Sequence, residues 1–427
     1  MTIAILTPDE VRAVDAAAPE PVEVLIARAG AAVAAEALDL LGGGYGRHIT
    51  VIAGKGNNGN DGRVAATLLR RRGAVVDVVE PSVDSVDWCD LVIDAAFGTG
   101  FRGTWDPPDV QGSPVLAVDL PSGLDAVTGE GNALEAERTV TFQALKPAHL
   151  LTDSSGEIVV ADIGLDVSSA GAWLVEDDDV VLPPRPRSTH KWRAAVWVVA
   201  GSEGMTGAAT LAARAAQRAG AGYVRSSPGD GAPVEAVAAP LPVGGWDGLD
   251  RFRAAVVGPG MGREHDDLIR TLVATATVPC VVDGDGLTAL GRDARSHVQP
   301  TTILTPHDGE YERLAGHPPG PDRFAAARDL AASLGCVVLL KGSTTVVADP
   351  AGRVLVAAQG DARLATAGTG DVLSGIVGAL AAQGVAPFEA AAWGAHLHGL
   401  AGQAGPARGL VASDLVDRLP QVFAALG

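Results

Sequence analysis

The sequence is poor in the features that mark disulfide-rich, zinc-binding or membrane-spanning proteins. Its 427 residues include three cysteines, Cys89, Cys280 and Cys336, which lie far apart and lack metal-ligand spacing. A disulfide framework or zinc site is therefore not expected, and a reducing compartment fits this usage. No uninterrupted apolar run is long enough to span a membrane, and the first residues, MTIAILTPDE, do not resemble a signal peptide. We expect a cytoplasmic protein.

Positive charge is also scarce. Lysine and arginine number 32 against 51 aspartate and glutamate residues, which gives a net charge of −19. Such a chain repels phosphate backbones and anionic lipids, so we expect neither nucleic acid nor membrane as a partner. Hydrophobic residues make up 47% and charged residues only 19%, which is typical of α/β proteins with large cores. The length suggests two or three domains.

The P-loop motif, GxxxxGK followed by serine or threonine, is absent from both halves. In the first half a predicted strand, residues 49–53, leads into GKGNNGNDG, residues 54–62, and then into a predicted helix, 64–72. This order is typical of a Rossmann-like half, although the glycine spacing is not that of the dinucleotide fingerprint. Asn57, Asn58 and Asp61 add side-chain oxygens, so the loop is expected to hold a polar ligand or a cation.

The rest of the first half alternates between predicted strands and polar turns. Helices are expected in residues 8–41, interrupted at Pro19 and Pro21, and further strands at 75–79, 91–94, 115–119 and 139–142. In a parallel sheet the strand ends share one edge, so the following polar residues should converge there: Asn57, Asn58, Asp94, Asp119 and Ser122. Each acid could instead form a turn or cap a helix. Lys146 could bind phosphate or be solvated.

A linker is expected within residues 175–189, where an acidic run gives way to three prolines. We therefore expect one domain over residues 1–180 and a second over residues 188–427. In the second, predicted strands at 195–200, 254–257, 281–283, 303–304 and 337–340 each end in a glycine-rich or polar loop. The pattern predicts another open α/β sheet with its site at the strand ends.

The segment LATAGTGDVLSG, residues 364–375, is the strongest candidate site in the second half. Apolar residues from Val372 onward have helical spacing, and the small residues before them let backbone N–H groups approach an anion. Asp371, at the rim, could accept a proton during phosphoryl transfer or could simply cap the helix.

Three other candidates in this half have competing interpretations. Lys341, in KGSTT, could contact a phosphate or lie on the surface. His307 could belong to a site, a core or a helix cap. His396 and His398 are two residues apart, which favours a structural role over metal binding.

Several motifs in series resemble known families. GKGNNGNDG, DAAFGTG, DLPSGLDAVTG and TVTFQALKP resemble the NAD(P)H-hydrate epimerase family. GSEGMTGAA, GPGMG, TPHDGEYERL, LKGSTT, LATAGTGDVLSG and AQG resemble the ADP-dependent NAD(P)H-hydrate dehydratase family, which has a ribokinase-like fold. The resemblance implies an α/β chain, with an N-terminal Rossmann-like three-layer domain followed by a ribokinase-like α/β domain, in the order of the bifunctional bacterial repair enzymes.

For the first domain the resemblance implies interconversion of the R and S hydrates at C6 of the nicotinamide ring. It assigns K⁺ to Asn58, Asp94 and Ser122, and a catalytic role to Asp119. The implied substrate contacts are Asn57, Asn58, Gly59, Asn60, Asp61, Gly98, Thr99, Gly100, Phe101, Arg102, Gly103, Thr104 and Asp119. Asn60 stands where the family usually has glycine, which adds a side chain at an expected point of close backbone approach.

For the second domain the resemblance implies that ADP, with Mg²⁺, phosphorylates the hydroxyl of the S-hydrate. Phosphate is then eliminated, leaving NAD(P)H and AMP. The implied nucleotide contacts are Lys341, Gly342, Ser343, Thr344, Thr345, Gly368, Thr369 and Gly370. The implied substrate contacts are Gly260, His307 and Asp371, with Asp371 as the catalytic base.

The expected partners are therefore NADHX, NADPHX and ADP, together with further copies of the chain as a homo-oligomer. An alternative is a ribokinase-like small-alcohol kinase fused to a non-catalytic nucleotide-binding module. The presence of Asn58, Asp94 and Ser122 together favours a catalytic first domain.

Overall fold

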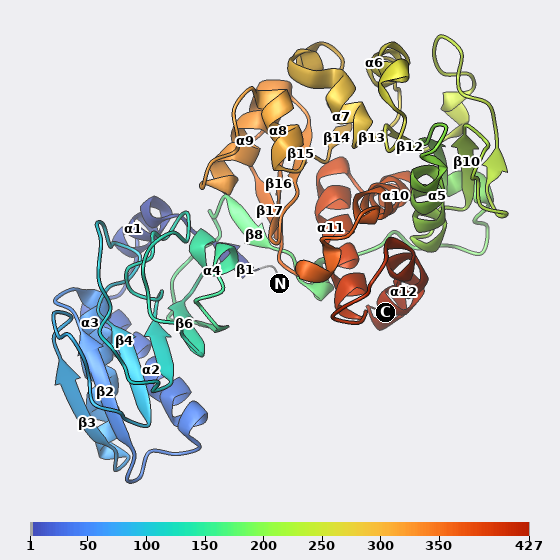
Figure 1. Ribbon diagram of the computed structural model, residues 1–427. Helices are drawn as coiled ribbons and strands as arrows, with labels where there is room; N and C mark the ends of the chain where they lie inside the picture. The colour runs from blue at the N-terminus through green and yellow to red at the C-terminus, as the bar shows by residue number, and fades with distance from the viewer. Residues whose placement is uncertain (1–2, 427) are drawn as a thin grey trace. The chain divides into compact units, whose positions relative to one another are not determined.

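The computed structural model describes residues 3–426, which form two compact units. The first is Ile3–Gly171 and the second begins at Ala172, so the chain enters the second unit before the proline-rich segment. Figure 1 draws the first in blue to teal and the second in green to red. Within the described residues, no helix combines the length and apolarity needed to cross a membrane.

The first unit is a parallel sheet in the order β3-β2-β4-β5-β6-β7. The strands of this sheet are β2 (His48–Ala53), β3 (Val75–Val79), β4 (Leu91–Ala95), β5 (Val115–Val118), β6 (Arg138–Phe142) and β7 (Glu157–Ala161), and the short β1 (Ile3–Ile5) is not part of it. The helices of the first unit are α1 (Pro8–Ala16), α2 (Val22–Leu41), α3 (Asn57–Arg71) and α4 (Pro147–Leu151). The central strands β4 and β5 are buried throughout, and Asp94 is their one charged residue, because both faces of the sheet are covered.

Helices α2 and α3 cover one face of this sheet and share a core with it. The other face is covered by irregular segments that carry Val86, Cys89 and Trp105. A Cβ atom added at Gly30 would lie 2.5 Å from Val64 Cβ, so this glycine allows α2 to pack closely on α3. Helix α3 begins at Asn57, seven residues before the predicted start, so most of the expected Gly/Asn loop is the first part of a helix.

The second unit is a mostly parallel sheet, with hydrogen-bonded neighbours in the order β8-β17-β16-β15-β14-β13-β12-β9-β10-β11. Its strands are β8 (Ala172–Leu174), β9 (Ala195–Val199), β10 (Tyr223–Ser227), β11 (Val237–Ala238), β12 (Ala254–Val257), β13 (Cys280–Val282), β14 (Thr302–Leu304), β15 (Val337–Leu340), β16 (Thr345–Ala348) and β17 (Val354–Ala357). Only the pairings of β16 with β15 and β17 are antiparallel.

The helices of this unit lie on both faces of its sheet (Figure 1). They are α5 (Thr206–Arg218), α6 (Asp266–Ala274), α7 (Asp285–Leu290), α8 (Asp308–Ala315), α9 (Arg323–Leu334), α10 (Thr369–Ala382), α11 (Pro387–Gln403) and α12 (Ala412–Ala425). Helices α5, α10, α11 and α12 share one hydrophobic core with the sheet. Because β9, β12, β13, β14 and β15 are parallel, the loops that follow them meet at one edge.

Candidate functional sites

In the first unit, Asp94 and Ser122 meet at the carboxyl ends of β4 and β5. The Ser122 hydroxyl donates to Asp94 Oδ1 at 2.6 Å, and the Ser122 N–H donates to Asp94 Oδ2 at 2.8 Å. The Ser122 hydroxyl also accepts from the Phe97 N–H at 2.8 Å. Both side chains are almost fully buried, and burial raises the pKa of Asp94 despite these hydrogen bonds.

Asn58 lies in the first turn of α3, at the same edge of the sheet. Neither atom of its amide group has a hydrogen-bond partner among residues 3–426, although both atoms are buried. A Cβ added at Gly98 would lie 3.4 Å from Asn58 Oδ1 and 2.7 Å from Asp119 Oδ2. Asn58 and Asp119 therefore face the same glycine, and an unpartnered amide oxygen lies close to a carboxylate.

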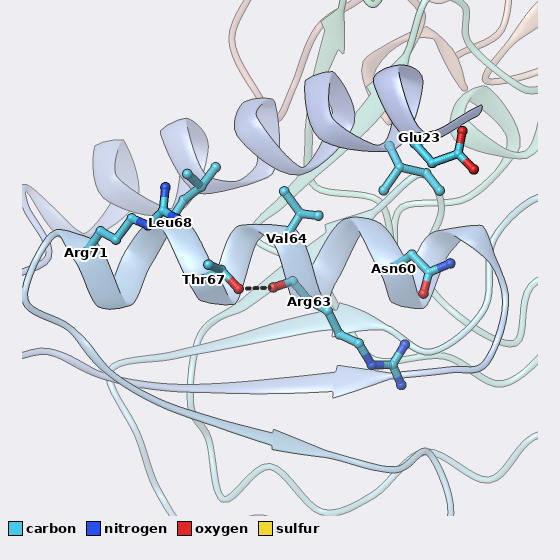
Figure 2. Close-up of a pocket in the computed structure, with 8 residues that line it drawn as sticks. Glu23, Asn60, Arg63, Val64, Thr67, Leu68 and Arg71 are labelled. Atoms are coloured by element: carbon cyan, nitrogen blue, oxygen red, sulfur yellow. Dashed lines mark hydrogen bonds between the residues drawn. The ribbon is translucent and has the colours of Figure 1, made fainter. Parts of the chain in front are cut away.

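One position in the first turn of α3 has no room for a side chain. That position is Gly59, where a Cβ would lie 1.9 Å from the Gly54 carbonyl oxygen. Figure 2 shows Asn60 at a groove between α2 and α3, with Glu23 on the opposite side. Asn60 is the only expected site residue among the residues that line this groove.

Asp119 follows β5 in a left-handed conformation, with φ of 68°, and contacts the expected substrate segment. Its Oδ2 accepts from the Thr99 N–H and the Thr99 hydroxyl, both at 2.8 Å. Its Oδ1 accepts from Lys146 Nζ at 2.6 Å. Lys146 is 2% exposed, so the prediction that it is solvated is wrong.

The other predicted substrate contacts of this unit differ in exposure. Asp61 is buried, and one of its carboxylate oxygens has no partner in the described part of the chain. The Phe101 ring lies 4.6 Å from the Phe97 ring, and the Phe101 N–H donates to Gly98 O. Asn57, Gly100, Arg102, Gly103 and Thr104 are exposed.

In the second unit, α10 begins with the predicted anion-binding segment. Gly368 is the N-cap, with φ of 90°, and Asp371 is the third helical residue. Because Gly368 is the N-cap and Asp371 lies inside the helix, the interpretation of Asp371 as the N-cap is wrong. Burial, followed by repulsion from Asp283, raises the pKa of Asp371 to about 7, and Lys341 opposes this rise. A carboxyl group with such a pKa can accept a proton near neutrality.

Beside Asp371 lies a buried ion cluster formed by Asp283, Glu310 and Lys341. Lys341 Nζ lies 2.7 Å from Asp283 Oδ1 and 3.4 Å from Glu310 Oε2. The Ser374 hydroxyl, from α10, donates to Asp283 Oδ2 at 2.8 Å. A Cβ added at Gly370 would lie 3.4 Å from Asp283 Oδ2 and 3.6 Å from Lys341 Nζ. The cluster thus lies against the first turn of α10, and Lys341 is not a surface lysine.

Lys341 is the first residue of the expected nucleotide-binding segment, 341–345, which follows β15. Its side chain points to the carboxylates of Asp283 and Glu310. Arg323 Nη2 donates to Lys341 O at 2.7 Å and lies 3.1 Å from a Cβ added at Gly342. Ser343 is exposed, Thr344 is buried and Thr345 begins β16. The Thr369 hydroxyl donates to Leu364 O and Thr366 O, both at 2.9 Å.

His307 and Gly260 lie in loops at the same edge of this sheet. His307 is the N-cap of α8 and its Nδ1 accepts from the Gly309 N–H at 3.0 Å, which confirms the capping interpretation. Gly260 has φ of 61°, and a Cβ there would lie 2.9 Å from Ala208 Cβ. His396 is buried against Asp177, with 2.7 Å between Nε2 and Oδ1. No cluster of three or more metal-ligating His, Cys, Asp or Glu side chains occurs in residues 3–426.

Asp283 and Glu310 were not predicted as site residues. Both stand in motifs that the sequence displays, DGDGL after β13 and TPHDGE after β14. The strand-end rule that selected Asp94 and Asp119 applies equally to Asp283.

Comparison with known proteins identifies the family of both units. The family model for NAD(P)H-hydrate dehydratase matches residues 196–421, and that for the YjeF-related protein N-terminus matches residues 22–87 and 80–148. A bifunctional NAD(P)H-hydrate repair enzyme of Mycobacterium tuberculosis (strain ATCC 25618 / H37Rv) is 42% identical over 392 residues, covering 82% of each chain. The chain belongs to the bifunctional NAD(P)H-hydrate repair enzymes. A further repair enzyme, from Mycobacterium leprae, is 38% identical and covers 90% of each chain.

Solved structures support the assignment of the second unit of this repair enzyme. The ADP/ATP-dependent NAD(P)H-hydrate dehydratase of Bacillus subtilis, co-crystallized with ATP and Mg²⁺, is 30% identical with a TM-score of 0.52. It covers 59% of this chain and 98% of its own. The alternative of an unrelated small-alcohol kinase fused to a binding module is not favoured, since both halves match the repair enzyme in its order.

Proposed function

We propose that the chain repairs hydrated NADH and NADPH by two reactions, epimerisation in the first unit and nucleotide-dependent dehydration of the S-hydrate in the second. One observation supports the dehydration reaction above all. Asp371, in the first turn of α10 and three residues after the N-cap Gly368, has a pKa raised to about 7. Membership in the bifunctional family supports both halves.

In the proposed dehydration, Asp371 accepts the proton of the C6 hydroxyl as that oxygen attacks the terminal phosphate of ADP. The backbone N–H of Gly370 and the positive end of α10 stabilise charge on the transferred phosphoryl group. The N1 lone pair then expels phosphate from C6, since phosphate leaves far more readily than hydroxide. The resulting N1=C6 cation loses a proton from C5 to solvent, which forms the C5=C6 double bond of NAD(P)H. The products are NAD(P)H, AMP and phosphate.

Mg²⁺ fits the second unit if the phosphates of the bound nucleotide supply part of its ligands. The protein offers no three-residue metal cluster within residues 3–426, and Mg²⁺ is commonly bound by one or two carboxylates together with substrate phosphates. Glu310 would supply such a carboxylate oxygen, because its buried side chain lies in the first turn of α8 beside Lys341, while Asp371 remains the base. Bound Mg²⁺ would neutralise phosphate charge during transfer.

K⁺ fits the first unit. Asn58 offers an amide oxygen without a partner, and Asp94 is a buried carboxylate with no cationic partner among the described residues. Ser122 accepts one hydrogen bond at its hydroxyl, which leaves a second lone pair for a cation. Hard oxygen donors and a single formal charge suit a monovalent ion. Its effect would be to fix the loops around Gly98 and Asp119.

The direct test is to incubate purified S-hydrate of NADH with the protein, ADP and Mg²⁺. We expect NADH, AMP and phosphate in equal amounts, and a parallel series with ATP decides which nucleotide is preferred. ADP consumption without NADH formation would contradict dehydration and return the small-alcohol kinase to consideration.

A further inference from the structure

Lys146 is a lysine enclosed by acceptors in the first unit. Its Nζ donates to Asp119 Oδ1 at 2.6 Å, to the Thr141 hydroxyl at 2.7 Å and to Ala144 O at 3.3 Å. These three acceptors match the three hydrogens of an ammonium group. Lys146 and Asp119 thus form an ion pair inside the first unit.

Both carboxylate oxygens of Asp119 already accept hydrogen bonds, Oδ1 from Lys146 and Oδ2 twice from Thr99. Burial alone would raise the pKa of Asp119, but the Lys146 charge and these hydrogen bonds lower it to about 2. Asp119 therefore remains ionised near neutrality and is poorly suited to carry a proton. Its chemistry is that of a fixed negative charge.

The main chain ties the same residues together. His149 Nε2 lies 2.8 Å from Asp119 O, and the Lys146 N–H donates to His149 Nδ1 at 2.9 Å. Because Nδ1 accepts from a backbone N–H, the proton of a neutral ring is assigned to Nε2, which donates to Asp119 O. Burial, followed by the Lys146 charge, lowers the pKa of His149 to about 4, which keeps the ring neutral. The two hydrogen bonds of His149 thus hold Asp119 in its left-handed conformation.

Resting on the proposed epimerase activity, we infer that Lys146 is a positioning residue for epimerisation that holds Asp119 as a fixed carboxylate facing the reacting ring. In that reaction the C6–O bond breaks while the N1 lone pair forms the N1=C6 bond, and the hydroxyl leaves as water with a proton from solvent. Water then adds to the other face and returns a proton to solvent. Asp119 stabilises the cationic ring between these steps and exchanges no proton.

Other charged groups around Asp119 make the role of Lys146 testable. Asp61, on α3, and Asp15, on α1, both repel Asp119, and burial followed by this repulsion raises the pKa of each, that of Asp61 to about 8. Lys146 and neutral His149 contact Asp119 directly. If Lys146 loses its charge, Asp119 remains buried near two carboxyl groups, so its pKa must rise.

The experiment follows conversion of R-hydrate to S-hydrate by the full chain in K⁺ over a pH series, with the non-enzymatic rate subtracted. We expect Lys146→Met to lower this rate by roughly 10²-fold near neutrality and to recover activity as pH rises and Asp119 ionises. The parent should show no such rise, and Lys191→Met, which alters an exposed lysine, should match the parent. Dehydration of S-hydrate measures the folding of each variant's second unit. A Lys146→Met enzyme with the parental rate and pH profile would overturn the inference.

The double variant Lys146→Met/Asp119→Asn removes both charges and avoids an isolated buried carboxylate, so it should fold even where Lys146→Met does not. If Lys146 acts through Asp119, the double variant epimerises as slowly as Asp119→Asn alone. Losses that multiply would overturn the inference. A parent enzyme that does not epimerise would instead refute the proposed first activity, which keeps the two failures distinct.

Discussion

Lys341 Nζ lies 2.7 Å from Asp283 Oδ1 and 3.4 Å from Glu310 Oε2, directly against the first turn of α10. The ammonium thus balances two buried carboxylates, and one of them, Asp283, acts on Asp371. Burial would raise the pKa of Asp283, but Lys341 and the Ser374 hydroxyl lower it. Asp283 therefore stays ionised and contributes the repulsion that raises the pKa of Asp371.

This pairing predicts a strongly non-additive pair of substitutions. Lys341→Met leaves two buried carboxylates without a cation and should lower the free energy of unfolding by about 3–5 kcal/mol. Lys341→Met/Asp283→Asn should lose clearly less than the sum of the two single losses. Chemical denaturation of the parent, Lys341→Met, Asp283→Asn and the double variant checks this expectation. Arg328→Met, on α9, is the control for loss of a cation. Additive losses would show that the pair is not coupled.

Asp371→Asn should lower dehydration of S-hydrate by roughly 10²-fold or more while leaving ADP binding largely intact. Asparagine has nearly the same size but cannot act as the base. Turnover and ADP affinity measured side by side check this, and Asp414→Asn, in the first turn of α12, should behave like the parent. Parental turnover in Asp371→Asn would contradict the assigned role.

The pH dependence of the dehydration rate should reflect the ionisation of Asp371. A base works in its ionised form, and the pKa of Asp371 is raised to about 7. The rate at limiting S-hydrate should therefore increase as pH rises toward about 7 and level off above it. Rates in a buffer series of constant ionic strength test this. A rate that is already level from pH 5 would indicate a base with an ordinary carboxyl pKa.

Asp94→Ala should abolish R-to-S conversion while leaving dehydration of pure S-hydrate unchanged, because Asp94 lies in the first unit. Replacement of K⁺ by tetramethylammonium, which is too large for an Asn58–Asp94 site, should have the same effect on the parent. Asp87→Asn, at an exposed aspartate nearby in sequence, serves as the control. Full epimerisation by Asp94→Ala, or in tetramethylammonium, would refute the cation site.

The extent of the second unit predicts where a fragment can begin. Strand β8 pairs with β17, the Val175 N–H donates to Val356 O, and Asp177 contacts His396, all before residue 188. A fragment that starts at Ala172 should therefore be more stable than one that starts at Ser188. Thermal unfolding of the two fragments measures the difference. Equal midpoints would show that residues 172–187 contribute no stability to this unit.

Strong local patterns in the sequence predicted much of the fold. Strand β3 has the predicted ends because a β-branched run is bounded by a glycine and a proline. Helix α3 begins earlier than predicted because asparagine and glycine disfavour helices on average, whereas here their small or polar side chains occupy its first turn at the sheet edge. The β16–β17 hairpin was not predicted, although Asp349 to Gly352 carries a turn signal.

The candidate sites were predictable to a different degree. The strand-end rule placed Asp94, Ser122 and Asp119 at one edge because parallel topology alone determines it. The roles of Lys146 and Lys341 depend on partners 27 and 58 residues away in sequence, and local pattern carries no information on such pairs. The same holds for the pKa of Asp371, which depends on burial by the folded chain.

Conversion of pure R-hydrate tests the account of a bifunctional repair enzyme most directly. The full chain is supplied with the R-hydrate of NADH, K⁺, Mg²⁺ and limiting or excess ADP, and NADH formation is followed over time. The account predicts complete conversion to NADH with excess ADP, one AMP for each NADH, and an R/S mixture without NADH when ADP is omitted. R-hydrate that persists unchanged while S-hydrate is dehydrated, or NADH formed without nucleotide, would contradict it.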